Sequence, residues 1–197
     1  GTSWSEQNDM GTARYVASGF GTQTAAGCVG GSGSSNATEE YDGSSWTAGG
    51  NYPTPIYSFC SCGPQTAAMG CGGYSPAAEA KTTLTCHYDG SSWTTSGSMV
   101  VARQAHWTSG SQTDAIAMAG YQPPGAATLT TEQYNGSNWV TGVNSATPRG
   151  TLAGSSTTGA SAFIAGGQSN AGPNSNATEE FTGETTAARA VKTVDFD

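Results

Sequence analysis

YDGSSW occupies Tyr41–Trp46 and recurs unchanged at Tyr88–Trp93, and a near copy, YNGSNW, occupies Tyr134–Trp139. Two partial copies, GTSW at Gly1–Trp4 and FTGET at Phe181–Thr185, resemble the end and the beginning of the same motif. The aromatic residues that open the motifs, Tyr41, Tyr88, Tyr134 and Phe181, are 47, 46 and 47 residues apart. Self-similarity at such a period indicates a repeat architecture.

Two further features recur in phase with this motif. A glycine pair or its remnant precedes each opening aromatic residue, at Gly30-Gly31, Gly72-Gly73, Ala119-Gly120 and Gly166-Gly167. Ten residues after each tryptophan lies an arginine site, occupied by Arg14, Ile56, Arg103 and Arg149. We interpret the repeated side chains as scaffold: the aromatic residues pack between repeats, and the arginines bind carbonyls or the glutamates of the TEEY segments. The scaffold set is Trp4, Trp46, Trp93, Trp139, Tyr41, Tyr88, Tyr134, Phe181, Arg14, Arg103 and Arg149.

The length variation of the repeat is confined to one segment. From each tryptophan to the second glycine of the next pair the distances are 27, 27, 27 and 28 residues, whereas from that glycine to the next aromatic residue they are 10, 15, 14 and 14. The variable segments are Ser32–Asn36, Tyr74–Lys81, Tyr121–Ala127 and Gln168–Asn176. Loops that vary on a constant scaffold are where binding function usually resides.

Composition and strand pattern together favour an all-β fold. Glycine accounts for 29 of 197 residues and charged residues for 10%, which argues against a helical bundle because the usual helix formers are scarce. Each repeat contains four short apolar or β-prone runs separated by Gly, Asn, Ser and Thr. Four short antiparallel strands per repeat make one blade of a β-propeller.

The split copy at the two ends predicts how the propeller closes. Residues Thr182–Thr185 end the third strand of the fourth blade, and the fourth strand then comes from the N-terminus, with Trp4 in the place of Trp46. Such closure removes an exposed sheet edge; the alternative is a fragment of a longer array. Residues 1–185 form the propeller domain, and 186–197 form a tail whose apolar Val191, Val194 and Phe196 predict a contact in a homo-oligomer.

The glycine pair, the tyrosine and the tryptophan five residues later resemble the kelch repeat, a blade motif of β-propellers. More narrowly, GTARYVASGFGTQTAAGCVGG and ATEEYDGSSWTAGG resemble kelch-like repeats of tail-fibre and other virion proteins in marine tailed phages. The departures are Ile56, Ala119 and Phe181, which has no tryptophan after it. The resemblance implies a non-enzymatic module on a virion surface, in a tail fibre or another fibre. The alternatives are a purely structural decoration or spacer of a virion or filament, and a secreted bacterial lectin or adhesin.

The expected partners are a host-surface glycan or protein and other virion subunits. A formal charge of −8 opposes binding to nucleic acid or anionic lipid, and no apolar run is long enough to insert into a membrane. In propellers the variable loops share a rim with the blade-to-blade linkers. Candidate ligand residues on that rim are Tyr52, Tyr74 and Tyr121, which would stack on sugar rings, and Gln122, Gln168 and Asn170, which would hydrogen-bond hydroxyls.

No catalytic residue, cofactor or metal ligand is expected. The five cysteines, Cys28, Cys60, Cys62, Cys71 and Cys86, lack a zinc spacing and are expected to be free thiols. The copper oxidases of the kelch fold need two His and two Tyr at the axis, and His87 and His106 lie on different strands of consecutive repeats. Glu39-Glu40 and Glu179-Glu180 are unsuited as an acid–base pair because adjacent residues of a strand point to opposite faces.

Overall fold

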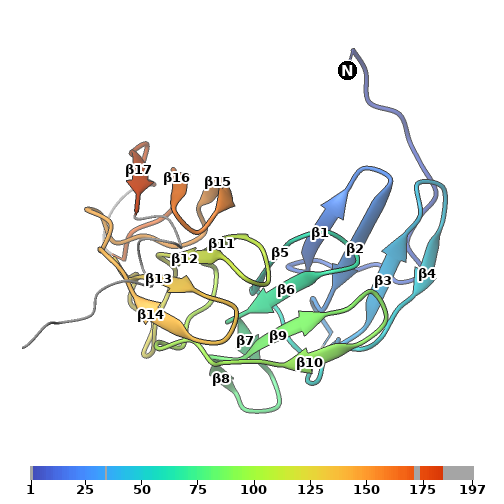
Figure 1. The fold of residues 1–197 in the computed structure, drawn as a ribbon, viewed down its shortest axis with the longest axis horizontal. Helices are drawn as coiled ribbons and strands as arrows, with labels where there is room; N and C mark the ends of the chain where they lie inside the picture. Colours follow the sequence, from blue (N-terminus) through green and yellow to red (C-terminus); the bar gives the residue numbers. More distant parts are fainter. Residues whose placement is uncertain (1, 34, 171–173, 184–197) are drawn as a thin grey trace, which may run out of the picture.

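The computed structural model describes residues 2–33, 35–170 and 174–183, and in these ranges every regular element is a β-strand. Four antiparallel sheets form the blades of a β-propeller (Figure 1). Blade one contains β1 (Ser18–Thr22), β2 (Ala25–Val29), β3 (Thr38–Tyr41) and β4 (Trp46–Ala48). Blade two contains β5 (Cys60–Cys62), β6 (Ala68–Cys71), β9 (Thr85–Tyr88) and β10 (Trp93–Thr95), with a hairpin of β7 (Tyr74–Ser75) and β8 (Ala80–Lys81). Blade three contains β11 (Trp107–Gly110), β12 (Ala115–Met118), β13 (Thr131–Tyr134) and β14 (Trp139–Thr141), and blade four contains β15 (Ala153–Thr158), β16 (Ser161–Ala165) and β17 (Thr178–Thr182).

The four-bladed all-β architecture confirms the expectation from the repeat. The first strand of each blade is innermost, and the inner strands contact one another in the order β1, β5, β11, β15. The second strands β6 and β12 are buried at every position, because each sheet packs between two neighbours. The glycine pairs turn the chain at the ends of the second strands with positive φ, and Ala119 takes the same conformation at φ 59° although it carries a Cβ.

The tryptophans of blades two and three lock neighbouring blades together. Trp93 stacks on Tyr88 with ring centroids 4.8 Å apart, and its indole N–H donates to Thr38 Oγ1 of blade one at 2.9 Å. Trp139 repeats the arrangement, with Tyr134 at 4.9 Å and Thr85 Oγ1 of blade two at 2.9 Å. These residues therefore have the scaffold role that the repeat predicts.

The repeated arginines form buried ion pairs within their blades. Arg14 pairs with Glu39, Arg103 with Glu132 and Arg149 with Glu179, and the other amino group of each guanidinium donates to two backbone carbonyls. In blade two the arginine site is Ile56 and the glutamate position is Cys86, and both lie in one apolar cluster. The scaffold reading of the arginines is confirmed, and blade two replaces the whole ion pair with apolar contacts.

The N-terminal segment differs from the expectation. Residues 2–17 contain no strand, Trp4 is 103% exposed, and the sheet of blade four has three strands among the described residues. The segment lies beside Tyr41 and Trp46 of blade one, and in Figure 1 it runs away from β17. The prediction that it closes blade four within this chain, and that Trp4 packs as scaffold, is therefore wrong for this structure.

The physical reason is that the four blades form an open arc and not a closed ring (Figure 1). In the described ranges no hydrogen bond joins blade four to blade one, and β15 does not pack on β1 as the other inner strands pack on their neighbours. The segment before β1 therefore does not meet blade four of its own chain. The expected tail, 186–197, lies outside the described residues.

Candidate ligand-binding surface

One face of the propeller gathers the variable loops and the linkers between blades, as the sequence predicts. The residue after the arginine site bridges the residue after the glycine pair in three blades: Tyr57 with Tyr74, Gln104 with Tyr121, and Gly150 with Gln168. In blade one the Ser32 N–H donates to the Tyr15 carbonyl at 2.9 Å. We call this surface the loop face, defined by Tyr15, Tyr57, Tyr74, Gln104, Tyr121 and Gln168.

Two tyrosines form an aromatic pair over blade two. The rings of Tyr57 and Tyr74 are 5.1 Å apart between centroids and inclined by 32°. Both side chains are half-buried. Tyr74 begins β7, so the hairpin of the longest variable loop fixes its backbone. The pair therefore presents apolar ring surface from a braced loop.

A second group spans blades three and four. The Tyr121 hydroxyl donates to the Gln168 carbonyl and to Gln168 Oε1 at 3.2 and 3.3 Å, and the Ala127 N–H donates to Asn170 Oδ1 at 2.6 Å. The Tyr121 ring lies against Gly150, where any side chain would collide with it. Three of the predicted ligand residues, Tyr121, Gln168 and Asn170, are thus brought together on the loop face.

Gln122 is committed to its own loop. Its amide Nε2 donates to Thr128 Oγ1 at 2.7 Å and to Thr130 Oγ1 at 3.0 Å. Both acceptors lie in the same connection between β12 and β13. The amide nitrogen of Gln122 therefore braces the loop.

Tyr52 does not belong to the ligand surface. Its side chain is 1% exposed and packs between the rings of Phe59 and Trp93, and its hydroxyl donates to the Gly70 carbonyl at 3.3 Å. Burial raises the pKa of this hydroxyl well above its usual value. No face of the ring is open to a sugar, so the expectation that Tyr52 stacks on one is wrong.

Two further tyrosines of the loop face, one exposed and one half-buried, are not among the ligand residues predicted from the sequence. Tyr15 is 73% exposed, and Tyr57 forms the pair with Tyr74. A signal for both was present, because Tyr15 and Tyr57 directly follow the arginine site just as Tyr74 and Tyr121 directly follow the glycine pair.

His106, Cys60 and Cys62 belong to the blades and not to the loop face. Burial, and then the Arg103 charge, lower the pKa of His106 to about 3, and burial raises the pKa of Cys60 and Cys62 to about 12. All five cysteines are unpaired, as expected. Over the described ranges, no three His, Cys, Asp or Glu side chains are grouped so as to hold a metal ion.

Glu39 and Glu40 serve different partners, in agreement with their opposite directions on β3. Glu39 binds Arg14 of its own blade, whereas Glu40 accepts the Tyr88 hydroxyl of blade two. The hydrogen bond with Glu40 adds to burial in raising the pKa of Tyr88. The two carboxylates do not meet at one spot.

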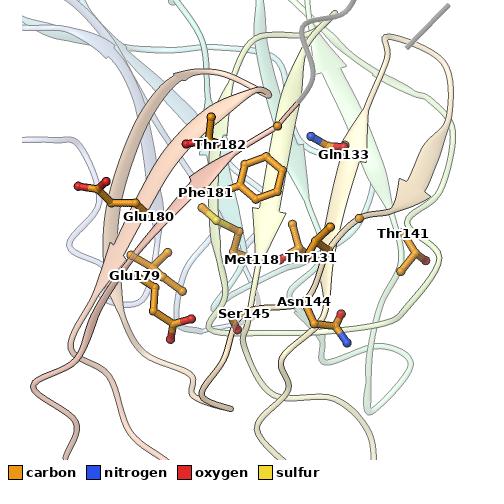
Figure 2. Close-up of a pocket in the computed structure, with 14 residues that line it drawn as sticks. Met118, Thr131, Gln133, Thr141, Asn144, Ser145, Glu179, Glu180, Phe181 and Thr182 are labelled. Carbon is orange, nitrogen blue, oxygen red and sulfur yellow. The ribbon is translucent and has the colours of Figure 1, made fainter. Parts of the chain in front are cut away.

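A groove of about 710 Å³ lies between blades three and four (Figure 2), and no tyrosine of the loop face lines it. It is lined by Met118, Thr131, Gln133, Thr141–Ser145, Ile164 and Glu179–Gly183. These residues belong mainly to β13, β17 and the segment after β14. The groove is therefore a gap in the packing between two blades.

No protein-family model matches the chain, and no curated protein is significantly similar to it. In the part of the chain that the structure describes, no helix is long and apolar enough to cross a membrane.

Proposed function

We propose that this chain is a non-enzymatic module of a phage virion surface, part of a tail fibre or another fibre, and that its loop face binds a glycan or protein of the host surface. The observation that carries the proposal is the gathering of Tyr57, Tyr74, Tyr121 and Gln168 on one face. The last three of these residues lie on loops whose lengths vary between repeats. The resemblance of the repeat to kelch-like phage proteins supplies the virion setting.

The chemistry of the loop face suits an uncharged glycan. Aromatic rings supply apolar area at a small entropic cost, and amides supply hydrogen bonds. Sugar rings present C–H groups to an aromatic face and hydroxyls to an amide, so Tyr74 and Gln168 match both kinds of group. A net charge of −8 disfavours strongly anionic ligands.

An array of purified bacterial surface polysaccharides tests the ligand class. We expect the labelled protein to bind a subset of neutral glycans, and the double variant Tyr57→Ala, Tyr74→Ala to bind them at least about tenfold more weakly, because truncating an aromatic anchor costs more than about 1 kcal/mol. Gln23→Ala, in the turn at the opposite end of β1, is the matched control and should bind as the wild type does. Equal loss in both variants, or an array with no binding, contradicts a glycan ligand for the loop face.

Antibody labelling of intact particles and of bacterial surfaces tests the location. Labelling on a virion fibre supports the proposal. Labelling on a cell surface favours a bacterial lectin or adhesin. Virion labelling combined with no binding to glycans or to host-surface proteins favours a decoration or spacer.

A further inference from the structure

The interface between blades three and four lacks a component that the two preceding interfaces have. There, a tryptophan of the fourth strand stacks on the aromatic residue of its own blade and donates to a threonine of the preceding blade, as Trp93 does to Thr38 and Trp139 to Thr85. By repeat position, the residues that would receive the next tryptophan are Phe181 and Thr131. Both line the groove (Figure 2).

The groove has the chemistry of an indole site. Met118, Ile164 and Phe181 supply its apolar surface, and Figure 2 shows Phe181, Met118 and Thr131 around it. Among the described residues, none donates a hydrogen bond to Thr131 Oγ1. The groove is also lined by polar residues, among them Asn144, Ser145 and Glu180, but the apolar carbons beside Thr131 offer a surface for the ring of tryptophan and Thr131 Oγ1 an acceptor for its N–H.

A small residue enlarges this gap. Six residues after the tryptophan, Tyr52 and Met99 fill the first and second interfaces. At the third interface the equivalent residue is Ser145, which lines the groove. The interface between blades three and four therefore lacks the large apolar side chain that its counterparts have at this position, and a groove is open there.

The chain carries a segment with the matching sequence. Trp4 precedes the first residue of β1 by 14 residues, the spacing that separates Trp46 from β5, Trp93 from β11 and Trp139 from β15. The segment Thr2–Gln7 is exposed throughout and carries a fully exposed indole. Its spacing from β1 therefore matches that of a fourth strand, which would belong to the blade that precedes blade one.

Blade one also presents a docking surface that blade four can accept. Tyr88 and Trp93 of blade two dock on Glu40 and Thr38 of blade one. In blade one the equivalents of this pair are Tyr41, which is 8% exposed, and Trp46, which is half-buried. β15 of the same chain does not pack on β1, and it is the exposed segment Thr2–Gln7 that lies beside both aromatic residues. In blade four the equivalents of Thr38 and Glu40 are Thr178 and Glu180, both exposed.

We propose that a second copy of this chain completes the propeller, with each copy inserting its Thr2–Gln7 segment as the fourth strand of the other copy's blade four. Blade one of one copy docks on blade four of the other, so that Trp46 reaches Thr178. The same docking carries Trp4 into the groove, where its indole stacks on Phe181 and donates to Thr131 Oγ1. Two such contacts related by a twofold axis close the assembly, and β17 loses its unpaired edge.

Sedimentation of the full chain and of two variants tests this assembly. We expect a dimer whose dissociation constant rises at least tenfold with Trp4→Ala, and also with Thr131→Val, which keeps the shape of the groove but removes the acceptor. Tyr15→Ala, a similarly exposed aromatic residue of the loop face, is the control and should leave the dimer intact. Trp4 is free of packing contacts in the single copy, so its removal leaves the monomer folded, which circular dichroism verifies.

Acrylamide quenching, compared between the wild type and Trp4→Ala, reports whether Trp4 is shielded. Protection of Trp4 from acrylamide that appears only at protein concentrations at which the dimer forms supports the exchange of the Thr2–Gln7 segments between copies. A monomer with shielded Trp4 overturns the proposal in favour of closure within one chain. A monomer with exposed Trp4, or a dimer that is insensitive to Trp4→Ala, overturns it as well.

Discussion

Arg103 and Glu132 are both completely buried, which places one positive and one negative charge in the interior of the blade. The guanidinium also donates to the carbonyls of Ala119 and Thr130, and the carboxylate accepts the N–H groups of Val100 and Val101. The pair therefore ties the incoming linker to the second and third strands of its blade. Removing one partner leaves an uncompensated charge, whereas replacing both with apolar side chains can be neutral.

Blade two already carries such an apolar replacement, with Ile56 at the arginine position and Cys86 at the glutamate position. We expect Arg103→Ile alone to lower the free energy of unfolding by about 3–5 kcal/mol, and the double variant Arg103→Ile, Glu132→Cys to recover most of the loss. Recovery is incomplete because two linker N–H groups lose their acceptor. Urea unfolding monitored by tryptophan fluorescence measures both variants. A double variant as unstable as the single one would show that the ion pair is not interchangeable with the apolar pair.

His106 predicts how stability depends on pH. Its folded-state pKa of about 3 lies below the ordinary value of about 6.5, so the unfolded chain binds the proton more tightly than the folded chain. Stability should therefore fall as the pH drops below about 6.5, by up to about 1.4 kcal/mol per pH unit. The pKa of His87 is also lowered by burial, which acts in the same direction.

Thermal melts between pH 7 and pH 4.5 check this dependence. The Asp42 and Asp89 carboxyls, whose hydrogen bonds lower their pKa to about 2, titrate below this range. We expect His106→Gln to flatten the profile more than His87→Gln does. Equal profiles in the wild type and His106→Gln would mean that His106 has the same pKa in the folded protein as in the unfolded chain.

At the scale of elements, two parts of each repeat have separable roles. One is the segment of nearly constant length from each tryptophan to the next glycine pair, which we call the fixed frame, and the other is the variable loop that follows it. The blade-two loop is five residues longer than that of blade one, and it folds into the β7–β8 hairpin. Pro76–Ala80 are exposed or half-buried, so they contribute little to the core. Loop length itself affects stability only weakly, since the closure entropy grows with the logarithm of length.

Deleting Pro76–Ala80 should therefore change the melting temperature by only a few degrees. The matched control is deletion of Thr54–Ser58, five residues of the fixed frame that include the buried Ile56; this should prevent cooperative folding. Differential scanning calorimetry compares the two. A large loss of stability in the loop deletion would place the hairpin within the folded frame.

Strands and their partners were predictable because the repeat shows every element several times. The buried small residues of β6 and β12, and the pairing of arginine with the TEEY glutamate, follow from positions that recur. The direction of Tyr52 was harder to predict, because a linker has no alternating pattern. Its equivalents Met99 and Met10 were the available signal, since apolar residues at one repeat position indicate burial, and the fourth equivalent, the polar Ser145, weakened that signal. The position of Trp4 was not predictable. Its spacing from β1 indicates that its segment is a fourth strand, but it does not determine which blade that strand joins, or whether that blade belongs to the same copy of the chain.

At the scale of the whole molecule, shape and charge act against each other. The arc leaves Tyr41 and Trp46 uncovered by blade four and one edge of β17 unpaired among the described residues, and both features favour association. A formal charge of −8 per chain opposes it, because two copies repel each other at long range. The contacts that we propose between copies are aromatic, backbone and neutral hydrogen-bonded contacts, so the attraction itself depends weakly on salt.

Added salt should therefore strengthen self-association. Raising NaCl from about 0.02 to about 0.5 M shortens the screening length severalfold, which weakens the repulsion between copies and leaves the stacking of Trp4 on Phe181 unaffected. Equilibrium sedimentation across this range should show the dissociation constant falling, in the wild type and in Tyr15→Ala alike. If salt instead dissociates the dimer, opposite charges hold the copies together. The basic residues Arg189 and Lys192 of the tail, which lie outside the described residues, then become the first candidates, and removing residues 187–197 should abolish the salt effect together with the dimer.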